Sequence, residues 1–296
     1  MSADNRPATA LALAGSTAHR RGGRWVRDPM AFEDLAGAVS LAEATGYGSV
    51  WVPDHGVWDP FALLAALAPR TERIGLATGV VTLAGRGTDE IVAAAMTVDR
   101  VSEGRAILGV GSGPERRIAV VAERLGEVER ALGQGVPCYL AALGPSMVEL
   151  GGRAADGVLL NWCSPERVSR ARREVARGAE QAGRDPAEVT VAVYVRACLG
   201  HDQEHALAAL VEAAEMYAGI PAYRRQLETD GVEPIPGTMA RTLCVWGDRE
   251  PALERLAAWR EAGADLVVVY PVLAQEAVSS LTGTIMAASP DPAVER

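Results

Sequence analysis

The sequence predicts a closed (β/α)8 barrel, and three observations support that prediction. Eight short apolar runs alternate with helical segments along the 296 residues. The runs are apolar on consecutive residues rather than on alternate ones, which is typical of parallel strands buried on both faces. Four times, an amphipathic helix ends near a glycine and an apolar run follows within a few residues. This alternation over nearly 300 residues favours a closed barrel, and an open, doubly wound sheet is the alternative.

The eight runs are predicted to be strands at about 8–14, 48–52, 73–79, 105–110, 137–142, 157–162, 189–196 and 266–270. The run TLCVWG at 242–247 is a candidate ninth strand. Asp28 and Pro29 suit the N-cap and first position of one helix, and Thr88 can cap a later one. No linker or change of composition divides the chain, so a single domain over residues 1–296 is expected.

Composition limits the classes of function. The longest apolar runs are much too short to cross a bilayer, and the N-terminal segment lacks the charge order of a signal peptide. We therefore expect a cytoplasmic protein that does not enter membranes. The net charge of −9 is a weak argument against a nucleic-acid partner. The chain contains no lysine, which excludes Schiff-base and P-loop lysine chemistry.

Neither a disulfide framework nor a metal site is expected. The four cysteines are scattered singly and mostly inside apolar runs, as buried reduced thiols would be: Cys138, Cys163, Cys198 and Cys244. The segment HDQEH at 201–205 has two histidines at helical spacing, which can bind a metal. It lacks a third ligand nearby, so the solvated first turn of a helix is favoured.

In a barrel of this class, the reacting groups follow the C-terminal ends of the strands. The residues at these positions are rich in glycine and poor in carboxylates. They are Gly15-Ser16, Pro53-Asp54-His55, Thr78-Gly79-Val80, Gly111-Ser112-Gly113, Ala142-Leu143-Gly144, Asn161-Trp162, Arg196 and Tyr270-Pro271. Small residues that expose backbone N–H groups suit a flat cofactor and its phosphate better than they suit hydrolysis.

Asp54 and His55 are the candidate catalytic residues. A histidine at a strand tip can take or give a proton near neutral pH, and the adjacent carboxylate can tune it or bind the ligand. The alternative is that the pair caps the following turn. Their position at the active face of a barrel favours the catalytic interpretation.

Two further segments have open interpretations. GVGSG at 109–113 resembles a phosphate-binding turn, but Pro114 removes one N–H and the dinucleotide fingerprint is incomplete. An ordinary strand-to-helix turn is the alternative. The basic segment HRRGGRWVR at 19–27 is predicted to be a loop, which is either solvated or receives an anionic tail at the mouth of the site.

Taken together, five segments resemble successive signature segments of the bacterial luciferase-like superfamily. They are LAEATGYGSVWVPDH, DPFALLAALAPRTERIGLATGVV, DRVSEGRAILGVGSG, VPCYLAALGPSMVELGGRAADGVLLNW and REAGADLVVVYPV. Within the superfamily they are most similar to the branch that uses the deazaflavin coenzyme F-420, which includes methylenetetrahydromethanopterin reductase. The resemblance covers most of residues 8–163 and 241–272.

The resemblance implies a (β/α)8 barrel and roles for residues at five strand ends. Asp54 and His55 would face the deazaflavin ring. Thr78, Gly79 and Val80 would form the family's bulge, often with a non-prolyl cis peptide, that supports the rear of the ring, so a side chain at position 79 would meet the ring. The ribityl chain, phosphate and ring edge would be held by Gly111, Ser112, Gly113, Ala142, Leu143, Gly144, Pro145, Asn161 and Trp162.

The implied activity is hydride transfer between coenzyme F-420 and a small organic substrate. The alternatives are an FMN-dependent monooxygenase of the same fold and a non-catalytic barrel that binds a cofactor or another subunit. The family commonly has a long excursion between strands 4 and 5, whereas residues 114–136 leave space for little more than one helix, so a more open pocket is implied. The family also suggests a homodimer, with the apolar segments 61–68 and 91–96 as its interface.

Overall fold

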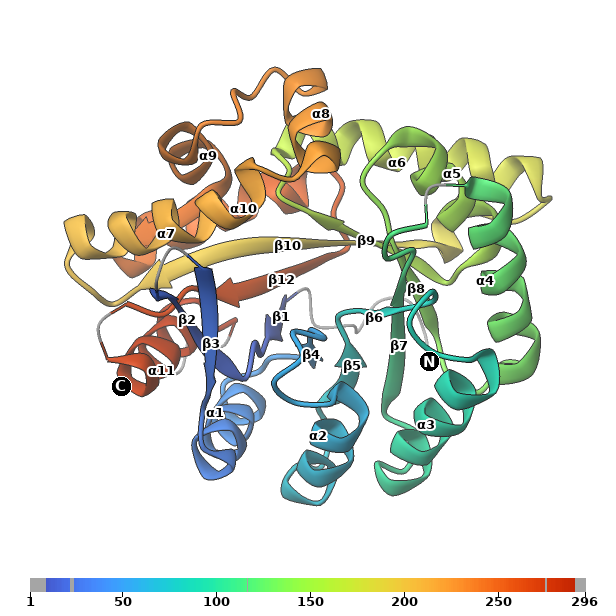
Figure 1. The fold of residues 1–296 in the computed structure, drawn as a ribbon, viewed down its shortest axis with the longest axis horizontal. Coiled ribbons are helices and arrows are strands. Elements are labelled where there is room, and N and C mark those ends of the chain that lie inside the picture. The colour runs from blue at the N-terminus through green and yellow to red at the C-terminus, as the bar shows by residue number, and fades with distance from the viewer. Residues whose placement is uncertain (1–8, 22–23, 116, 275, 291–296) are drawn as a thin grey trace.

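The structure, a computed structural model, describes residues 9–21, 24–115, 117–274 and 276–290. In this part of the chain, eight parallel strands close into a barrel, in which β12 pairs with β1 on one side and with β10 on the other (Figure 1). The barrel strands are β1 (Thr9–Ala12), β4 (Ser49–Val52), β5 (Gly75–Thr78), β7 (Ala106–Gly111), β8 (Cys138–Ala141), β9 (Gly157–Asn161), β10 (Thr190–Leu199) and β12 (Leu266–Pro271). The predicted strands and the closed barrel are confirmed, and the open sheet is excluded.

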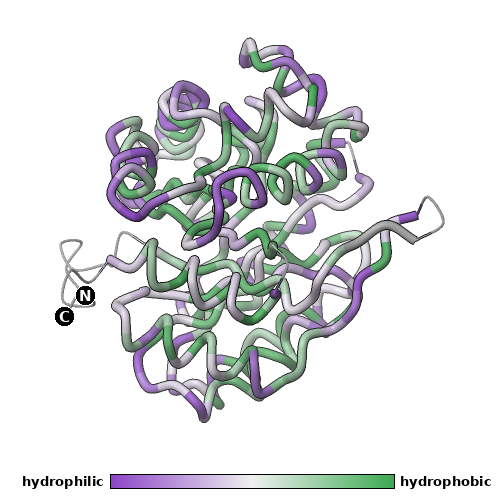
Figure 2. The backbone as a smooth tube through the Cα atoms, turned by 90° about the vertical axis from the view of Figure 1, so that its left-hand side faces the viewer, coloured by the Kyte–Doolittle hydropathy of each residue, from purple (hydrophilic) through white to green (hydrophobic). Residues whose placement is uncertain are grey.

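Helices cover the outside of the barrel (Figure 1), and Figure 2 shows apolar residues gathered inside with polar residues mostly on the outer helices. The helices are α1 (Phe32–Ala44), α2 (Pro60–Leu67), α3 (Thr88–Val101), α4 (Ile118–Leu132), α5 (Pro145–Ala154), α6 (Pro165–Gln181), α7 (Gln203–Ala218), α8 (Pro221–Thr229), α9 (Pro236–Leu243), α10 (Arg249–Glu261) and α11 (Ala277–Ala287). The described residues also contain the short 3-10 turns η2 (Ala68–Arg70) and η3 (Pro186–Glu188). The strand β6 (Val81–Thr82) is a short addition beside β7.

Local capping explains where several helices begin. The side chain of Asp59 accepts a hydrogen bond from the backbone N–H of Ala62 at 2.9 Å, and Pro60 occupies the first helical position of α2. In α6, the side chain of Ser164 likewise accepts a hydrogen bond from the backbone N–H of Arg167, and Pro165 occupies the first helical position. A capping oxygen satisfies an N–H that has no partner inside the helix, and proline has no N–H there to satisfy.

The barrel interior combines small residues with large aromatic ones. Trp51 and Tyr139 meet edge to face, with ring centroids 5.2 Å apart, and Tyr194 and Tyr270 do so at 5.3 Å. Alanines on the neighbouring strands leave room for these rings, and all four rings belong to one buried cluster. Because Tyr270 lies near the end of β12, this packing places its side chain near the mouth of the barrel.

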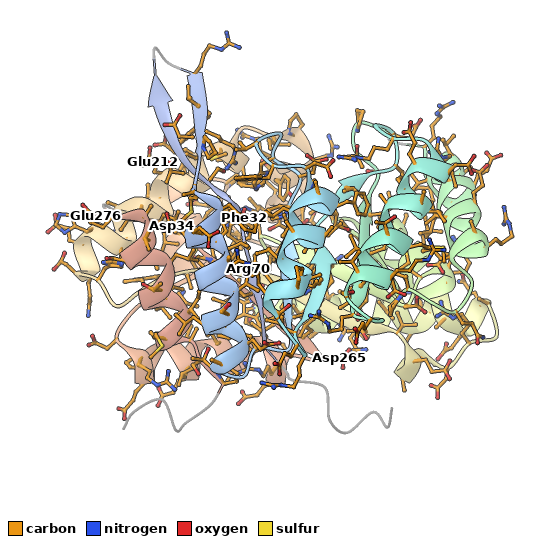
Figure 3. The ribbon with its side chains drawn as sticks, turned by 90° about the horizontal axis from the view of Figure 1, so that it is seen from below. Phe32, Asp34, Arg70, Glu212, Asp265 and Glu276 are labelled. Atoms are coloured by element: carbon orange, nitrogen blue, oxygen red, sulfur yellow. The ribbon has the colours of Figure 1, made fainter. Side chains whose placement is uncertain are left out.

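The segment after β1 differs from the prediction. Residues 16–21 and 24–29 form the antiparallel strands of a hairpin, β2 (Ser16–Arg21) and β3 (Arg24–Pro29), not a basic loop followed by a helix cap. Pro29 is paired with Ser16 in this hairpin, so Asp28 and Pro29 belong to a strand, and α1 begins three residues later with Ala31 as its N-cap. Figure 3 shows the hairpin extending from the end of the barrel that also carries Glu212, with Asp265 at the opposite end.

The N-cap of α3 is also one residue away from the predicted position. Gly87 is the N-cap, and its backbone N–H donates to the carboxylate of Glu90 at 2.9 Å. Thr88 is the first helical residue, and its hydroxyl donates to Glu127 instead. A glutamate three residues after the cap satisfies the N–H of the cap residue, which favours this register.

The candidate ninth strand is confirmed as β11 (Cys244–Gly247), and it lies beside the barrel wall. It pairs with the second half of β10, from Arg196 to Leu199, whereas the first half of β10 pairs with β9. The first half of the long strand β10 is therefore part of the barrel wall. Its second half packs into another buried cluster, which includes residues of α7 and α9. Arg196 lies where these two environments meet.

Three further predictions concern the remaining chain. The segment 114–136 contains one helix, α4, as expected. The four cysteines are buried free thiols, which confirms the interpretation of the scattered cysteines. In the described ranges, no helix combines the length and apolar character that a membrane crossing needs.

Candidate active site

A backbone bulge after β5 forms one wall of the barrel mouth. The peptide bond between Gly79 and Val80 is cis, as the family resemblance implied. The hydroxyl of Thr78 donates to the carbonyl of Gly109 and accepts from its N–H, both at 2.8 Å, which ties the bulge to β7. The oxygen of Thr78 is thus used within the barrel, and its side chain supports the bulge from behind.

Gly79 is packed closely against a tyrosine of the barrel interior. Its carbonyl accepts a hydrogen bond from the hydroxyl of Tyr194 at 2.8 Å. A Cβ atom at position 79 would lie 2.0 Å from that hydroxyl and 3.1 Å from the Cβ of Trp51. A side chain here would therefore enter the barrel and meet Tyr194, and a contact of such a side chain with a bound ring stays a prediction.

The turn that follows β7 packs against the bulge. A Cβ at Gly111 would lie 3.0 Å from a methyl group of Val80, and one at Gly113 would lie 3.2 Å from Thr82. Gly113 also has a positive φ of 62°, which a glycine adopts without strain. The hydroxyl of Ser112 contacts the carbonyl of Gly113 at 3.4 Å. Small residues here keep the turn close to the bulge.

The start of α5 fits the phosphate of the implied coenzyme. Gly144 is an exposed N-cap without a side-chain cap, Pro145 opens the helix, and no atom lies within 4 Å of a Cβ built on Gly144. The buried guanidinium of Arg167 donates to the carbonyl of Leu143 at 2.9 Å and pairs with Glu174 at 2.8 Å, which holds the turn in place. An uncapped helix N-terminus beside open space is suited to an anion.

Histidine and tyrosine meet across the mouth. The Nε2 atom of His55, just after β4, lies 2.8 Å from the hydroxyl of Tyr270 on β12. Burial, together with the positive charges of Arg27 and Arg196, lowers the pKa of His55 from 6.5 to about 3. The imidazole is therefore neutral at physiological pH. Burial also raises the pKa of Tyr270, so both groups are neutral, and the tautomer of His55 decides which of them donates the hydrogen bond.

Asp54 does not act on the imidazole of its neighbour. Its carboxylate accepts from the N–H of Gly56 at 3.3 Å and lies 3.4 Å from the guanidinium of Arg86, which pairs more closely with Asp59 at 2.6 Å. The side chain of Asp54 therefore caps the turn through Gly56, and its predicted contact with the coenzyme ring stays a prediction. His55 alone of the two enters the hydrogen bond with Tyr270.

Asn161 and Trp162 surround a buried cation. Asn161 accepts from Arg196 at 2.5 Å and donates to the hydroxyl of Tyr223 at 2.7 Å. The guanidinium carbon of Arg196 lies 4.3 Å from the centre of the Trp162 ring, and Trp162 is only 2% exposed. Asn161 and Trp162, both predicted to contact the coenzyme, thus contact Arg196. Fewer of their polar and ring atoms are therefore free to contact a ligand.

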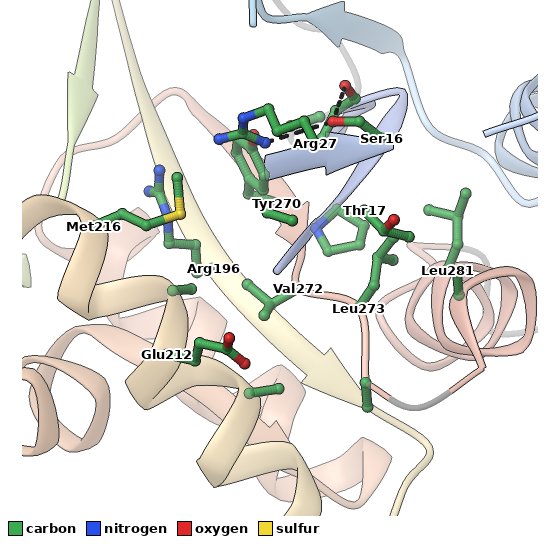
Figure 4. A pocket seen from close by; sticks show the side chains of 18 of the residues that line it. Ser16, Thr17, Arg27, Arg196, Glu212, Met216, Tyr270, Val272, Leu273 and Leu281 are labelled. Atoms are coloured by element: carbon green, nitrogen blue, oxygen red, sulfur yellow. Dashed lines mark hydrogen bonds between the residues drawn. The ribbon is translucent and has the colours of Figure 1, made fainter. Parts of the chain in front are cut away.

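A pocket of about 560 Å³ opens on the side of the mouth formed by β1, β10 and β12 (Figure 4). The hairpin, α7 and α11 contribute to its walls, and its polar groups include those of Arg27, Arg196, Glu212 and Tyr270. Its described lining contains none of the predicted coenzyme residues. The mouth therefore has two parts, a glycine-rich wall from β5 to β8 and a pocket, and the contact of Tyr270 with His55 lies between them.

Arg196 and Tyr270 lie at predicted strand ends but are not among the residues predicted to form the site. Arg27 lies in the segment predicted to be a loop, and Tyr194 lies inside a strand where no local pattern marks it. In the described residues, no group of three or more potential metal ligands is present. His205 instead contacts the carboxylate of Asp202, the N-cap of α7, at 3.0 Å.

The fold and the site define a (β/α)8-barrel protein with a cis-peptide bulge and a glycine-rich wall at its mouth. The family model of luciferase-like monooxygenases matches residues 11–127 and 119–266. The chain belongs to this luciferase-like family, which confirms the resemblance found in the sequence.

Curated relatives include enzymes of two kinds. The 5,10-methylenetetrahydromethanopterin reductase of Methanolobus tindarius is 33% identical over 237 residues, which cover 68% of this chain and 72% of the relative. The F420-dependent glucose-6-phosphate dehydrogenase of Amycolatopsis mediterranei is 27% identical over 296 residues, which cover 80% and 88%.

Solved structures agree on the fold. The coenzyme F420 dependent tetrahydromethanopterin reductase from Methanopyrus kandleri superimposes with a TM-score of 0.76 at 19% identity, over 96% of this chain and 98% of that chain. An F420-dependent secondary alcohol dehydrogenase in complex with an F420-acetone adduct gives 0.75 at 16% identity, over 99% and 100%. At these identities the similarity shows the barrel fold.

Proposed function

We propose that this protein is a coenzyme F-420-dependent oxidoreductase that transfers a hydride between the coenzyme and a small organic substrate. The observation that carries the proposal is the pairing of the Gly79–Val80 bulge with the open N-terminus of α5 at one barrel mouth. Two relatives support the same conclusion. One is named as an F420-dependent glucose-6-phosphate dehydrogenase and the other as a 5,10-methylenetetrahydromethanopterin reductase.

The residues present suit the coenzyme, which supplies the hydride donor or acceptor when bound. The backbone at Gly79 and Val80 would support the ring, and the first N–H groups of α5 beside Gly144 would hold the phosphate. Contacts from Asp54, Gly111, Ser112, Gly113, Ala142, Leu143, Pro145, Asn161 and Trp162 remain predictions from the family resemblance.

The protein's own groups would position the substrate and manage its proton. Tyr270 lines the pocket and is hydrogen-bonded to His55, so this pair would exchange a proton with a substrate oxygen next to the hydroxyl as the hydride moves. The apolar walls of the pocket would exclude water. Holding the reacting carbons about 3–3.5 Å apart is the remaining task of the pocket.

Reduction or oxidation of the coenzyme by the purified protein tests the proposal. The protein is mixed with oxidised or reduced coenzyme F-420 and a panel of small alcohols, aldehydes, ketones and unsaturated acids, and the visible absorption of the oxidised coenzyme is followed. We expect a substrate-dependent change in that absorption. Coenzyme binding without any such change would favour the non-catalytic barrel, and a tightly held FMN in the purified protein would favour the monooxygenase.

A further inference from the structure

The pocket contains a buried cation, Arg196, which is paired with none of the described carboxylates. Arg196 is 4% exposed, and among the described residues no carboxylate pairs with its guanidinium. Its compensation comes from one amide oxygen, that of Asn161, and from the rings of Trp162, Tyr217 and Tyr270, whose centres lie 4.3, 4.8 and 4.7 Å away.

This compensation leaves hydrogen-bond donors unused. A guanidinium carries five N–H donors, and the ring faces interact with its charge rather than with the N–H groups at its edge. Burying a cation is costly unless an anion or further acceptors meet it. Arg196 lines the pocket, so an anion in the pocket could supply what the protein does not.

A second cation reaches the same region from the hairpin. Arg27 is half-buried, and its one described hydrogen bond goes to the hydroxyl of Ser16 at 3.5 Å. Figure 4 shows the guanidinium groups of Arg27 and Arg196 on the same side of the pocket, near Tyr270. The pKa of His55 is lowered by the charges of both arginines, which agrees with their closeness to one point.

The rest of the pocket is mainly apolar. Its walls include Leu13, Met30, Met216, Val272, Leu273 and Leu281. Glu212 on α7 also faces the pocket (Figure 4), and His205 on the same helix lines it as well. The described lining has two guanidinium groups and one carboxylate, so the pocket favours a negative ligand, and its walls favour a ligand with an apolar body.

We propose that the pocket binds an organic anion with an apolar body, whose carboxylate or phosphate group is held by Arg27 and Arg196. The anion site stands on the geometry of the pocket alone. Its assignment to the substrate, rather than to an anionic part of the coenzyme, rests on the proposed function.

Three matched probes test the anion site in protein free of coenzyme. Octanoate, octanamide and octylammonium share one chain and differ in head-group charge, and calorimetric titration measures the Kd of each at neutral pH. We expect octanoate to bind at least about tenfold more tightly than octanamide, as for a charge-assisted hydrogen bond. Equal affinities, or a preference for octylammonium, would overturn the proposal.

Variants locate the site. Arg27→Gln should weaken octanoate binding about tenfold or more and leave octanamide binding unchanged. Arg24→Gln, an exposed position on the same hairpin, is the matched control and should change neither. Glu212→Gln should strengthen octanoate binding. Arg196→Gln should abolish the preference for octanoate over octanamide, provided that this variant folds. If Arg196→Gln does not fold, the result with Arg27→Gln alone tests the anion site. An Arg27→Gln protein that retains the full preference would contradict the proposal.

Coenzyme titrations separate the two assignments. If the anion belongs to the substrate, the wild-type protein and Arg27→Gln bind coenzyme F-420 with similar Kd values. A parallel loss of coenzyme and octanoate affinity in Arg27→Gln would assign the anion site to the coenzyme and overturn the substrate assignment. Failure of the wild-type protein to bind the coenzyme would instead overturn the proposed function, while the octanoate preference would still test the anion site.

Discussion

The Nε2 atom of His55 lies 2.8 Å from the hydroxyl of Tyr270, although 215 positions separate the two residues in the sequence. Closure of the barrel produces this contact, because β1 pairs with β4, which precedes His55, and with β12, which carries Tyr270. The contact joins a neutral imidazole to a hydroxyl that lines the pocket. It is the basis of the first two predictions.

Removing either partner of this contact should slow turnover. We expect His55→Ala to lower kcat by about 10²–10⁴-fold, with coenzyme affinity altered less. Tyr270→Phe should cause a loss of similar size. The double variant should be little worse than either single one, because both act on one proton.

Steady-state kinetics with the three variants measures this, and Tyr47→Phe is the control. The hydroxyl of Tyr47 is also buried, but it bonds to the carbonyl of Ile285 away from the site, so its loss should leave kcat unchanged. Near-normal turnover by His55→Ala would show that His55 only contributes to the turn.

The low pKa of His55 makes stability depend on pH in a defined direction. The unfolded chain takes up a proton at His55 as the pH falls below 6.5, whereas the folded protein does so only near pH 3. The stabilising contribution is therefore complete above pH 6.5 and is lost at about 1.4 kcal/mol per pH unit as the pH falls towards 3. Denaturation at pH 7, 6 and 5 should show a smaller loss of stability for His55→Gln than for the wild-type protein. Equal losses would mean that His55 titrates normally.

Gly79 should be intolerant of a side chain because of Tyr194. We expect Gly79→Ala to lower the free energy of unfolding by about 1–3 kcal/mol, since the new methyl group overlaps the tyrosine hydroxyl. Adding Tyr194→Phe removes that hydroxyl and should restore part of the loss. Chemical denaturation of both single variants and the double variant measures the coupling.

Gly37 supplies the control for this prediction. It is exposed in α1, and a Cβ there meets no atom within 4 Å, so Gly37→Ala should raise stability by about 0.5–1 kcal/mol. If Tyr194→Phe gave Gly79→Ala no relief, the overlap would not be the cause of its instability.

The start of α5 offers a test in which stability and binding separate. Gly144→Asp adds a favourable N-cap and should change stability by no more than a few tenths of a kcal/mol. The same carboxylate should repel the phosphate of the coenzyme and weaken its binding about tenfold or more. Gly144→Asn adds a cap of equal size without the charge and should weaken binding much less. If both variants bound the coenzyme as the wild-type protein does, the phosphate would lie elsewhere.

The family suggests that two copies associate. Light scattering on the purified protein at micromolar concentration should then give about twice the mass of one chain. A single-chain mass would remove the homodimer from the account.

Much of the fold was predictable because a parallel strand that is buried on both faces appears in the sequence as a short run of consecutive apolar residues. Eight apolar runs gave eight strands, and the run at 242–247 gave β11. The hairpin of β2 and β3 could not be predicted in this way, because its strands are largely polar and lack the apolar pattern of the barrel strands. Asp28 and Pro29 suit a helix start locally, and the pairing of β2 with β3 decides otherwise.

The site was partly predictable for a related reason. Strand ends can be read from the sequence, so His55, Gly79 and Gly144 could be placed at the mouth. The orientation of a side chain depends on distant partners, and these could not be read. Asp54 pairs with Arg86, and Asn161 accepts a hydrogen bond from Arg196. The hydroxyl of Tyr194 occupies the space that a side chain at Gly79 would need.

The central claim is that the barrel mouth holds coenzyme F-420, and equilibrium binding tests it most directly. The purified protein is titrated in parallel with coenzyme F-420 and with FMN, and quenching of the fluorescence of each ligand gives its Kd. The account predicts saturable binding of coenzyme F-420, weaker or absent binding of FMN, and loss of coenzyme affinity in Gly144→Asp. Tight binding of FMN with no binding of coenzyme F-420 would contradict it.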